Sequence, residues 1–216
     1  MINFIDVTLK HQNSRGIHNV SFNVHKGQFV YLMGPTGAGK STIINSIIKS
    51  VKPDSGQILV NNYDVSNLSE NELFLYRRDI GMVFQDFKLV NDRTIFENVA
   101  LPLQIIGIHK NIINEKVQNI LNKVGLKHKS QSKPFELSGG EQQKICVARA
   151  LIKNPKIVVA DEPTGNLDPS SSDDIIDLLE NESNKGTTII MATHNYPLIE
   201  NRIKHFIELN NGRVVS

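Results

Sequence analysis

A glycine-rich stretch that ends in lysine and serine is the strongest chemical pattern in the chain. It reads Gly34-Pro35-Thr36-Gly37-Ala38-Gly39-Lys40-Ser41 and continues into Thr42. Glycines let successive backbone N–H groups turn toward a phosphate, and a helix that starts here adds the positive end of its dipole. The lysine would reach the β- and γ-phosphates, and the serine hydroxyl would bind Mg²⁺. The alternative, a glycine turn without a ligand, gives no reason for the lysine and serine.

Two adjacent carboxylates follow an apolar run. Residues 157–160 are Ile-Val-Val-Ala, and Asp161 and Glu162 come directly after them. A run without alternation is typical of a central strand covered on both faces, and ligands bind at the carboxyl ends of such strands. We expect Asp161 to hold Mg²⁺, directly or through water, and Glu162 to orient or deprotonate an attacking water. Taken alone, such a pair more often consists of solvated loop charges, and its combination with the glycine-rich stretch favours the functional interpretation.

Two further polar side chains follow predicted strands. Gln85 follows the run 80–84, and its amide could contact Mg²⁺ or the attacking water. His194 follows the run 187–193, and its imidazole could donate to a γ-phosphate oxygen. The alternatives are a solvated loop amide and a structural histidine.

A second pattern suited to an anion lies farther along the chain. Residues 137–143 read Leu-Ser-Gly-Gly-Glu-Gln-Gln, and Ser138, Gly139, Gly140 and Glu141 open a predicted helix. Ser138 and Glu141 have the spacing of a capping box, and a glycine-rich helix N-terminus can also bind phosphate. One chain that already holds its nucleotide elsewhere has no evident need for a second phosphate site.

The elements that must position these residues alternate along the chain. Apolar runs predict strands over 2–8, 20–24, 28–33, 57–60, 80–84, 157–160, 187–192 and 206–209. Helical periodicity and capping signals predict helices over 39–50, 69–77, 94–106, 111–124, 138–153, 169–183 and 196–201. The caps are Ser69 with Glu72, Thr94 with Glu97, Ser138 with Glu141, Asp168 before Pro169, and the glycines 125 and 186. The pattern predicts an α/β core interrupted by a helical subdomain.

Composition limits the class of protein. The 216 residues carry a net charge of +2, one cysteine and 39% hydrophobic residues. This balance gives no field that would attract nucleic acid, and a single cysteine fits a reducing compartment. No apolar stretch approaches the roughly 20 residues that span a bilayer. The lysine-rich stretch 110–133 is interpreted as a solvated helix face, with contact to anionic lipid as the alternative.

Together these motifs resemble the ABC ATPase family over essentially the whole chain. The resemblance implies a P-loop NTPase (RecA-like) core over 1–85 and 155–216 with a small antiparallel β subdomain, and an inserted α-helical subdomain over 86–154. It implies binding of ATP and Mg²⁺ and hydrolysis of ATP. It also implies a head-to-tail dimer with a second copy, in which Ser138 and Gly140 contact the γ-phosphate held by the partner. A P-loop kinase would not explain the second phosphate motif.

Within the family, the chain is similar to the bacterial cell-division ATPases. The similarity rests on residues 82–86, 92–94, 98–103, 161–168 and 191–194. It implies an integral membrane partner resembling FtsX, control of peptidoglycan hydrolases, possible contacts with cytoplasmic division proteins, and a peripheral position on the cytoplasmic face of the plasma membrane. Lipoprotein-release and antimicrobial-peptide export ATPases are the main alternatives. A soluble ATPase of translation or DNA repair usually has two fused domains or a long coiled coil, and this chain has neither.

Three positions depart from the family pattern. His11 falls where an aromatic residue usually stacks on adenine, Lys144 replaces an arginine, and Asn195 replaces an aspartate.

The region 86–106 is expected to move the membrane partner. Its apolar loop residues Phe87, Leu89 and Val90 either contact that partner or pack locally.

Overall fold

A mainly parallel sheet forms the centre of the molecule. The computed structural model describes residues 1–10, 16–202 and 204–215, and His11, the predicted adenine contact, lies outside them. The strands of this sheet are β3 (Phe29–Met33), β6 (Ile80–Val83), β7 (Ile157–Asp161), β8 (Thr188–Thr193), β9 (His205–Asn210) and β10 (Arg213–Val214), in the order β10-β9-β3-β8-β7-β6. All neighbours pair in parallel except β10 with β9. Strands β3, β7 and β8 therefore end at the same edge.

A smaller antiparallel sheet lies beside it. Its strands are β1 (Ile2–Lys10), β2 (Gly16–Val24), β4 (Ser55–Val60) and β5 (Tyr63–Asp64), in the order β2-β1-β4-β5. The predicted α/β fold with an antiparallel β subdomain is confirmed. The short strands β5 and β10 were not predicted, because two residues are too few to establish a period.

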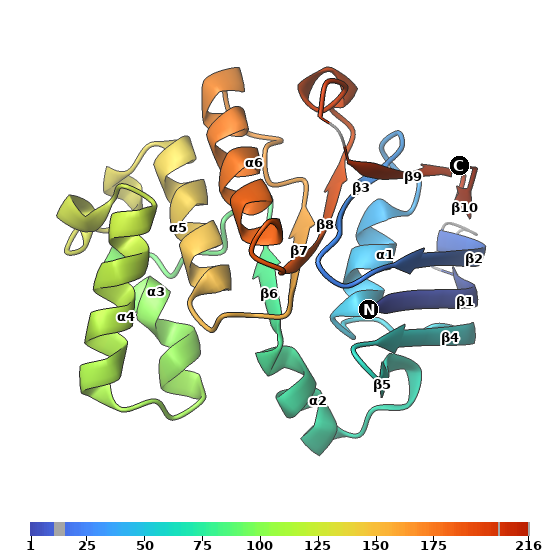
Figure 1. Ribbon diagram of the computed structural model, residues 1–216, viewed down its shortest axis with the longest axis horizontal. Helices are drawn as coiled ribbons and strands as arrows, with labels where there is room; N and C mark the ends of the chain where they lie inside the picture. Colours follow the sequence, from blue (N-terminus) through green and yellow to red (C-terminus); the bar gives the residue numbers. More distant parts are fainter. Residues whose placement is uncertain (11–15, 203, 216) are drawn as a thin grey trace.

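Six α-helices lie in the described part of the chain. They are α1 (Lys40–Ile47), α2 (Glu70–Arg78), α3 (Ile95–Ile105), α4 (Lys110–Lys123), α5 (Gly139–Leu151) and α6 (Pro169–Ser183). Figure 1 shows α1 between the two sheets, α5 and α6 on the opposite side of the parallel sheet, and α3 and α4 outermost. None of the helices in the described ranges is long and apolar enough to cross a membrane.

The predicted helix starts are confirmed in detail. Capping boxes join Ser69 to Glu72, Thr94 to Glu97 and Ser138 to Glu141, and Asp168 caps α6 ahead of Pro169. The glycines 125 and 186 have positive φ just beyond α4 and α6, as a helix end requires. One predicted helix is wrong: over 196–201 the chain makes only the short 3₁₀ turn Tyr196–Leu198. Six residues with a proline at the second position are too few to sustain an α-helix without strong packing.

Three apolar clusters hold the layers together. The first packs α1 between the sheets, and the second packs α5 and α6 on the other face of the parallel sheet. The buried members of the third all lie between 95 and 152 and fill the space among α3, α4 and α5, and Leu89 and Leu178 of α6 pack against them. The division of the chain into a core and a helical subdomain at 86–154 stays a prediction, and this separate cluster supports it.

Candidate nucleotide site

A cavity of about 330 Å³ lies at the edge where the central strands end. It is lined by Gly16, Thr36, Gly37, Gly39, Lys40, Ser41, Thr42, Gln85 and Glu162. Residues from three separate predicted motifs therefore face one space. Gly16, from the start of β2, is the lining residue that the sequence motifs did not reveal; β2 pairs with β1, and the start of β2 also packs against Gly39 and Gly212.

The loop between β3 and α1 has the backbone that a phosphate cradle requires. Gly34, Gly37 and Gly39 all have positive φ, at 146°, 83° and 105°. A Cβ at position 34 would lie 2.2 Å from the carbonyl oxygen of Leu209, so only glycine fits there. Gly39 is the N-cap of α1, and no side chain caps this helix. Lys40 and Ser41, the first two residues of α1, line the cavity, so the N-terminus of this helix can bind an anion there.

Lys40 points back over this loop. Its side chain is 4% exposed, and its Nζ donates to the carbonyl oxygens of Gly34 at 2.8 Å and Pro35 at 3.1 Å. The same Nζ lies 3.4 Å from Oε1 of Glu162. The ammonium group is thus held at the cavity, where it can pair with phosphate oxygens.

Ser41 and Asp161 form an oxygen pair suited to Mg²⁺. The Ser41 hydroxyl donates to Oδ1 of Asp161 across 3.1 Å. Neighbouring oxygens around an octahedral Mg²⁺ with bonds of 2.0–2.1 Å are about 3 Å apart, so the two oxygens fit one coordination shell. Burial raises the pKa of the Asp161 carboxyl above its ordinary value, and the hydrogen bond from Ser41 partly offsets this. A bound cation would favour the carboxylate form.

Glu162 and His194 meet although 32 residues separate them in the chain. Nδ1 of His194 lies 2.9 Å from Oε2 of Glu162. Glu162 has a φ of 45°, unusual for a non-glycine residue, and its N–H donates to the carbonyl oxygen of Ala192 at the end of β8. Strained backbone of this kind occurs at functional sites when the surrounding structure holds it. The turn after β7 aims the Glu162 carboxylate between Lys40 and His194.

Gln85 completes the cavity from the end of β6. Its backbone oxygen accepts a hydrogen bond from the Asn166 amide at 3.5 Å. A Cβ at Gly165 would lie 2.9 Å from the Gln85 amide nitrogen. The absence of a side chain at position 165 therefore gives Gln85 its room. The roles of Gln85 and of the other site residues in catalysis stay predictions.

The second phosphate motif lies apart from this cavity. Ser138 accepts a hydrogen bond from the Glu141 N–H, and Glu141 accepts one from the Ser138 N–H, which lowers the Glu141 pKa. A Cβ at Gly140 would lie 2.6 Å from the Ser171 hydroxyl, whereas the nearest atom to one at Gly139 is 3.6 Å away. Neither Ser138, Gly139, Gly140 nor Glu141 is among the described residues that line the cavity. Figure 1 shows α5 and α1 on opposite sides of the parallel sheet.

Local packing accounts for most of the apolar loop after Gln85. Phe87 and Leu89 are half-buried and pack against the second cluster, while Val90 is 38% exposed. Packing therefore favours the local alternative for Phe87 and Leu89.

The fold and the site together define a P-loop ATPase, and comparisons with known proteins place it more narrowly. The family model described as ABC transporter matches residues 17–165. The cell division ATP-binding protein FtsE of Bacillus subtilis is 46% identical over 201 residues, which covers 93% of this chain and 88% of the relative. FtsE of Escherichia coli K12 is 40% identical, covering 99% and 97%. The chain belongs to the ABC transporter family, as one of its ATP-binding cassettes, and is an ATPase.

A solved structure agrees with this placement. An ATP-binding cassette determined as a dimer in a post-hydrolysis state, bound to ADP and Pi, superposes with a TM-score of 0.89 at 34% identity. The match covers 100% of this chain and 97% of that one. The similarity extends through both sheets and all six helices.

Proposed function

We propose that this chain is the ATPase of a bacterial cell-division complex, in which two copies close on two ATP molecules and drive an integral membrane partner of the FtsX type. The observation that carries the proposal is the meeting of Lys40, Ser41, Asp161, Glu162 and His194 at one edge of the sheet. The names of the relatives favour cell division over lipoprotein release or peptide export.

The hydrolytic step follows from the positions of the side chains. Lys40 binds the β- and γ-phosphates, with the N–H groups of the glycine loop around them. Ser41 and Asp161 would hold Mg²⁺, which would supply positive charge to neutralise the phosphates. Glu162 accepts a hydrogen bond from the attacking water, and His194 keeps the Glu162 carboxylate oriented. Gln85, which follows β6, would contact Mg²⁺ or the attacking water with its side-chain amide.

The second copy supplies the remaining phosphate ligands. Ser138, Gly139 and Gly140 form a helix tip outside their own chain's cavity, so their natural ligand is a nucleotide held by another molecule. The Glu141 carboxylate stabilises this tip through the capping box. Loss of the γ-phosphate removes contacts on both sides, and the dimer loosens.

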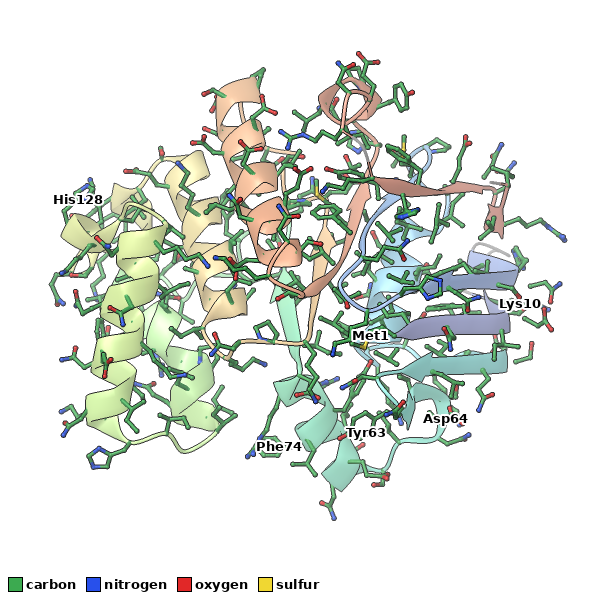
Figure 2. The ribbon with its side chains drawn as sticks, in the orientation of Figure 1. Met1, Lys10, Tyr63, Asp64, Phe74 and His128 are labelled. Atoms are coloured by element: carbon green, nitrogen blue, oxygen red, sulfur yellow. The ribbon has the colours of Figure 1, made fainter. Side chains whose placement is uncertain are left out.

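A groove between α2 and α3 is the proposed contact for the membrane partner. It encloses about 470 Å³, and its lining consists of Glu70, Leu73, Phe74, Arg77, Arg78, Leu101, Pro102, Ile105, Ile106 and Lys153. Phe74 is 46% and Ile105 is 61% exposed, and Figure 2 shows Phe74 on α2. A mainly apolar groove with three basic residues and one acidic residue in its lining suits a short amphipathic helix that carries acidic residues. Leu101, Pro102, Ile105 and Ile106 of this groove lie in the region 86–106 that was expected to move the partner, and the rest of its lining lies outside that region.

Capture from membranes tests the proposal. We expect the tagged chain to retain a membrane protein related to FtsX, and we expect Ile105→Glu to lose it while keeping ATP hydrolysis, because Ile105 lies outside the cavity. Depletion of the chain should block division. Retention of a lipoprotein-release or peptide-export membrane subunit, with normal division on depletion, would contradict the cell-division role.

A further inference from the structure

The turn that follows Gln85 has a strained backbone. Phe87 and Lys88 both have positive φ, at 58° and 50°. The Lys88 N–H donates to the Asp86 carbonyl oxygen at 2.6 Å, which closes a three-residue turn around Phe87. This form of γ-turn is rare, and two successive bulky residues in the left-handed region persist only where neighbours hold them.

Helix α5 provides those neighbours. Arg149 donates from Nη2 to the Phe87 carbonyl oxygen at 2.7 Å and from Nη1 to the Lys88 carbonyl oxygen at 2.6 Å. The Cys146 thiol donates to the same Phe87 oxygen across 3.0 Å. A planar guanidinium presents two parallel N–H donors, so it can fix two adjacent carbonyl groups at once.

The same helix also holds the other end of the segment. The Gln143 amide is buried, and its Nε2 donates to the Phe84 carbonyl oxygen at 3.2 Å, just before Gln85. Positions 143, 146 and 149 are three residues apart and share one side of α5. Residues 84–88, with Gln85 among them, are therefore fixed to α5 at both ends.

The start of α5 touches this segment as well. A Cβ at Gly139 would lie 3.9 Å from the Cζ atom of the Phe87 ring. Gly139 is the first residue of α5 and follows Ser138. One helix thus carries the tip that faces the other copy's nucleotide and the groups that hold the Gln85 segment at this chain's own cavity.

We propose that Arg149 is a positioning residue that locks the turn after Gln85 to α5, so that the Gln85 amide and the Ser138 tip move as one body. This inference rests on the proposed ATP-dependent dimer. It predicts that occupation of one nucleotide site alters the position of Gln85 at the other, through α5. Arg149 itself touches neither nucleotide.

The test compares Arg149→Ala and Arg149→Lys with Lys144→Ala. Lys144 lies on the same helix and pairs with Asp174 at 2.7 Å, away from the turn, so its removal controls for loss of a cation on α5. For Arg149→Ala we expect kcat to fall by roughly 3- to 30-fold while the Kd for ATP stays within about twofold of the parent value, because the phosphate loop is intact. Arg149→Lys should be intermediate, since one ammonium cannot bridge both carbonyls, and Lys144→Ala should resemble the parent.

Two further readouts separate positioning from general damage. Cys146 is the sole cysteine and is buried, and burial raises its pKa to about 12, so its reaction with a thiol reagent reports opening of the turn. Labelling should be faster in Arg149→Ala, at unchanged Tm. Adding Lys88→Gly, which removes the left-handed strain at position 88 and leaves that at Phe87, should recover part of the lost kcat.

Three results would overturn the role of Arg149. These are an unchanged kcat in Arg149→Ala, equal losses of kcat and ATP affinity, or no recovery with Lys88→Gly. Failure of the proposed dimer is a separate outcome. In that case the chain with Glu162→Gln and an unchanged Arg149 would stay monomeric in ATP.

Discussion

The Nζ atom of Lys40 lies 3.4 Å from Oε1 of Glu162, while Oε2 of the same carboxylate lies 2.9 Å from Nδ1 of His194. Lys40 at the start of α1 and the residues that follow β7 and β8, Glu162 and His194, are therefore in contact with one another. The carboxylate is 17% exposed and the lysine 4%, so their interaction is only weakly screened by water. Glu162 is thereby placed beside the phosphate-binding lysine, where an attacking water must be positioned.

Replacement of Lys40 tests the phosphate cradle. We expect Lys40→Ala to weaken ATP binding by at least about tenfold, the equivalent of one charge-assisted hydrogen bond of about 1.5 kcal/mol. Lys52→Ala, at an exposed position that does not line the cavity, is the matched control. Calorimetric titration with Mg-ATP measures both, and an unchanged affinity in Lys40→Ala would contradict the cradle.

The raised pKa of Asp161 predicts a particular pH dependence of stability. Burial lifts this pKa in the folded chain above the ordinary value of 3.8 that the unfolded chain should have. Between the two pKa values the native state binds more protons than the unfolded state, so the free energy of unfolding falls as pH rises through that window. Urea denaturation should show this loss in the wild type relative to Asp161→Asn.

Mg²⁺ should restore the lost free energy of unfolding at pH values above the raised pKa of Asp161. Because the cation binds the carboxylate, it should stabilise the wild type more than Asp161→Asn at pH 7. A stability difference between the two chains that is flat with pH, or equal stabilisation by Mg²⁺, would show that Asp161 does not act as assigned.

Ser138 allows the helix cap to be separated from the phosphate contact. Ser138→Ala loses the cap, at a cost of about 1 kcal/mol in unfolding free energy, whereas Ser138→Asp keeps a good cap. The added carboxylate would, however, repel a γ-phosphate. We therefore expect Ser138→Asp to retain stability in denaturant titrations but to lose ATP-dependent dimerisation more fully than Ser138→Ala. Dimerisation of Ser138→Asp at the wild-type level would reduce this motif to a cap.

The sequence was sufficient to predict which residues meet at this edge of the sheet, because each of them lies in a local motif or directly follows a strand. The glycine loop, the carboxylates after β7 and the histidine after β8 each follow a clear apolar run. Because parallel strands end at one edge, their meeting could be expected before the structure. The capping boxes were equally clear, since they depend on residues three positions apart.

Contacts between distant segments could not be predicted in the same way. Gly16 reaches the cavity through contacts of β2 with β1 and with Gly39 and Gly212, which are distant in the sequence. Arg149 contacts backbone carbonyls 61 and 62 residues away, and a carbonyl group leaves no mark in the sequence. The sequence left open whether Phe87 and Leu89 contact a partner or pack locally, because the cluster that covers them comes from other elements.

The most direct test of the account is the mass of the Glu162→Gln chain in solution with and without Mg-ATP. Loss of the carboxylate should slow hydrolysis while leaving Lys40 and the glycine loop able to bind ATP, so the closed pair should accumulate. Size-exclusion chromatography with light scattering should then show a dimer with ATP and a monomer without it. A monomer at every saturating ATP concentration would contradict the claim that two copies close on shared nucleotides.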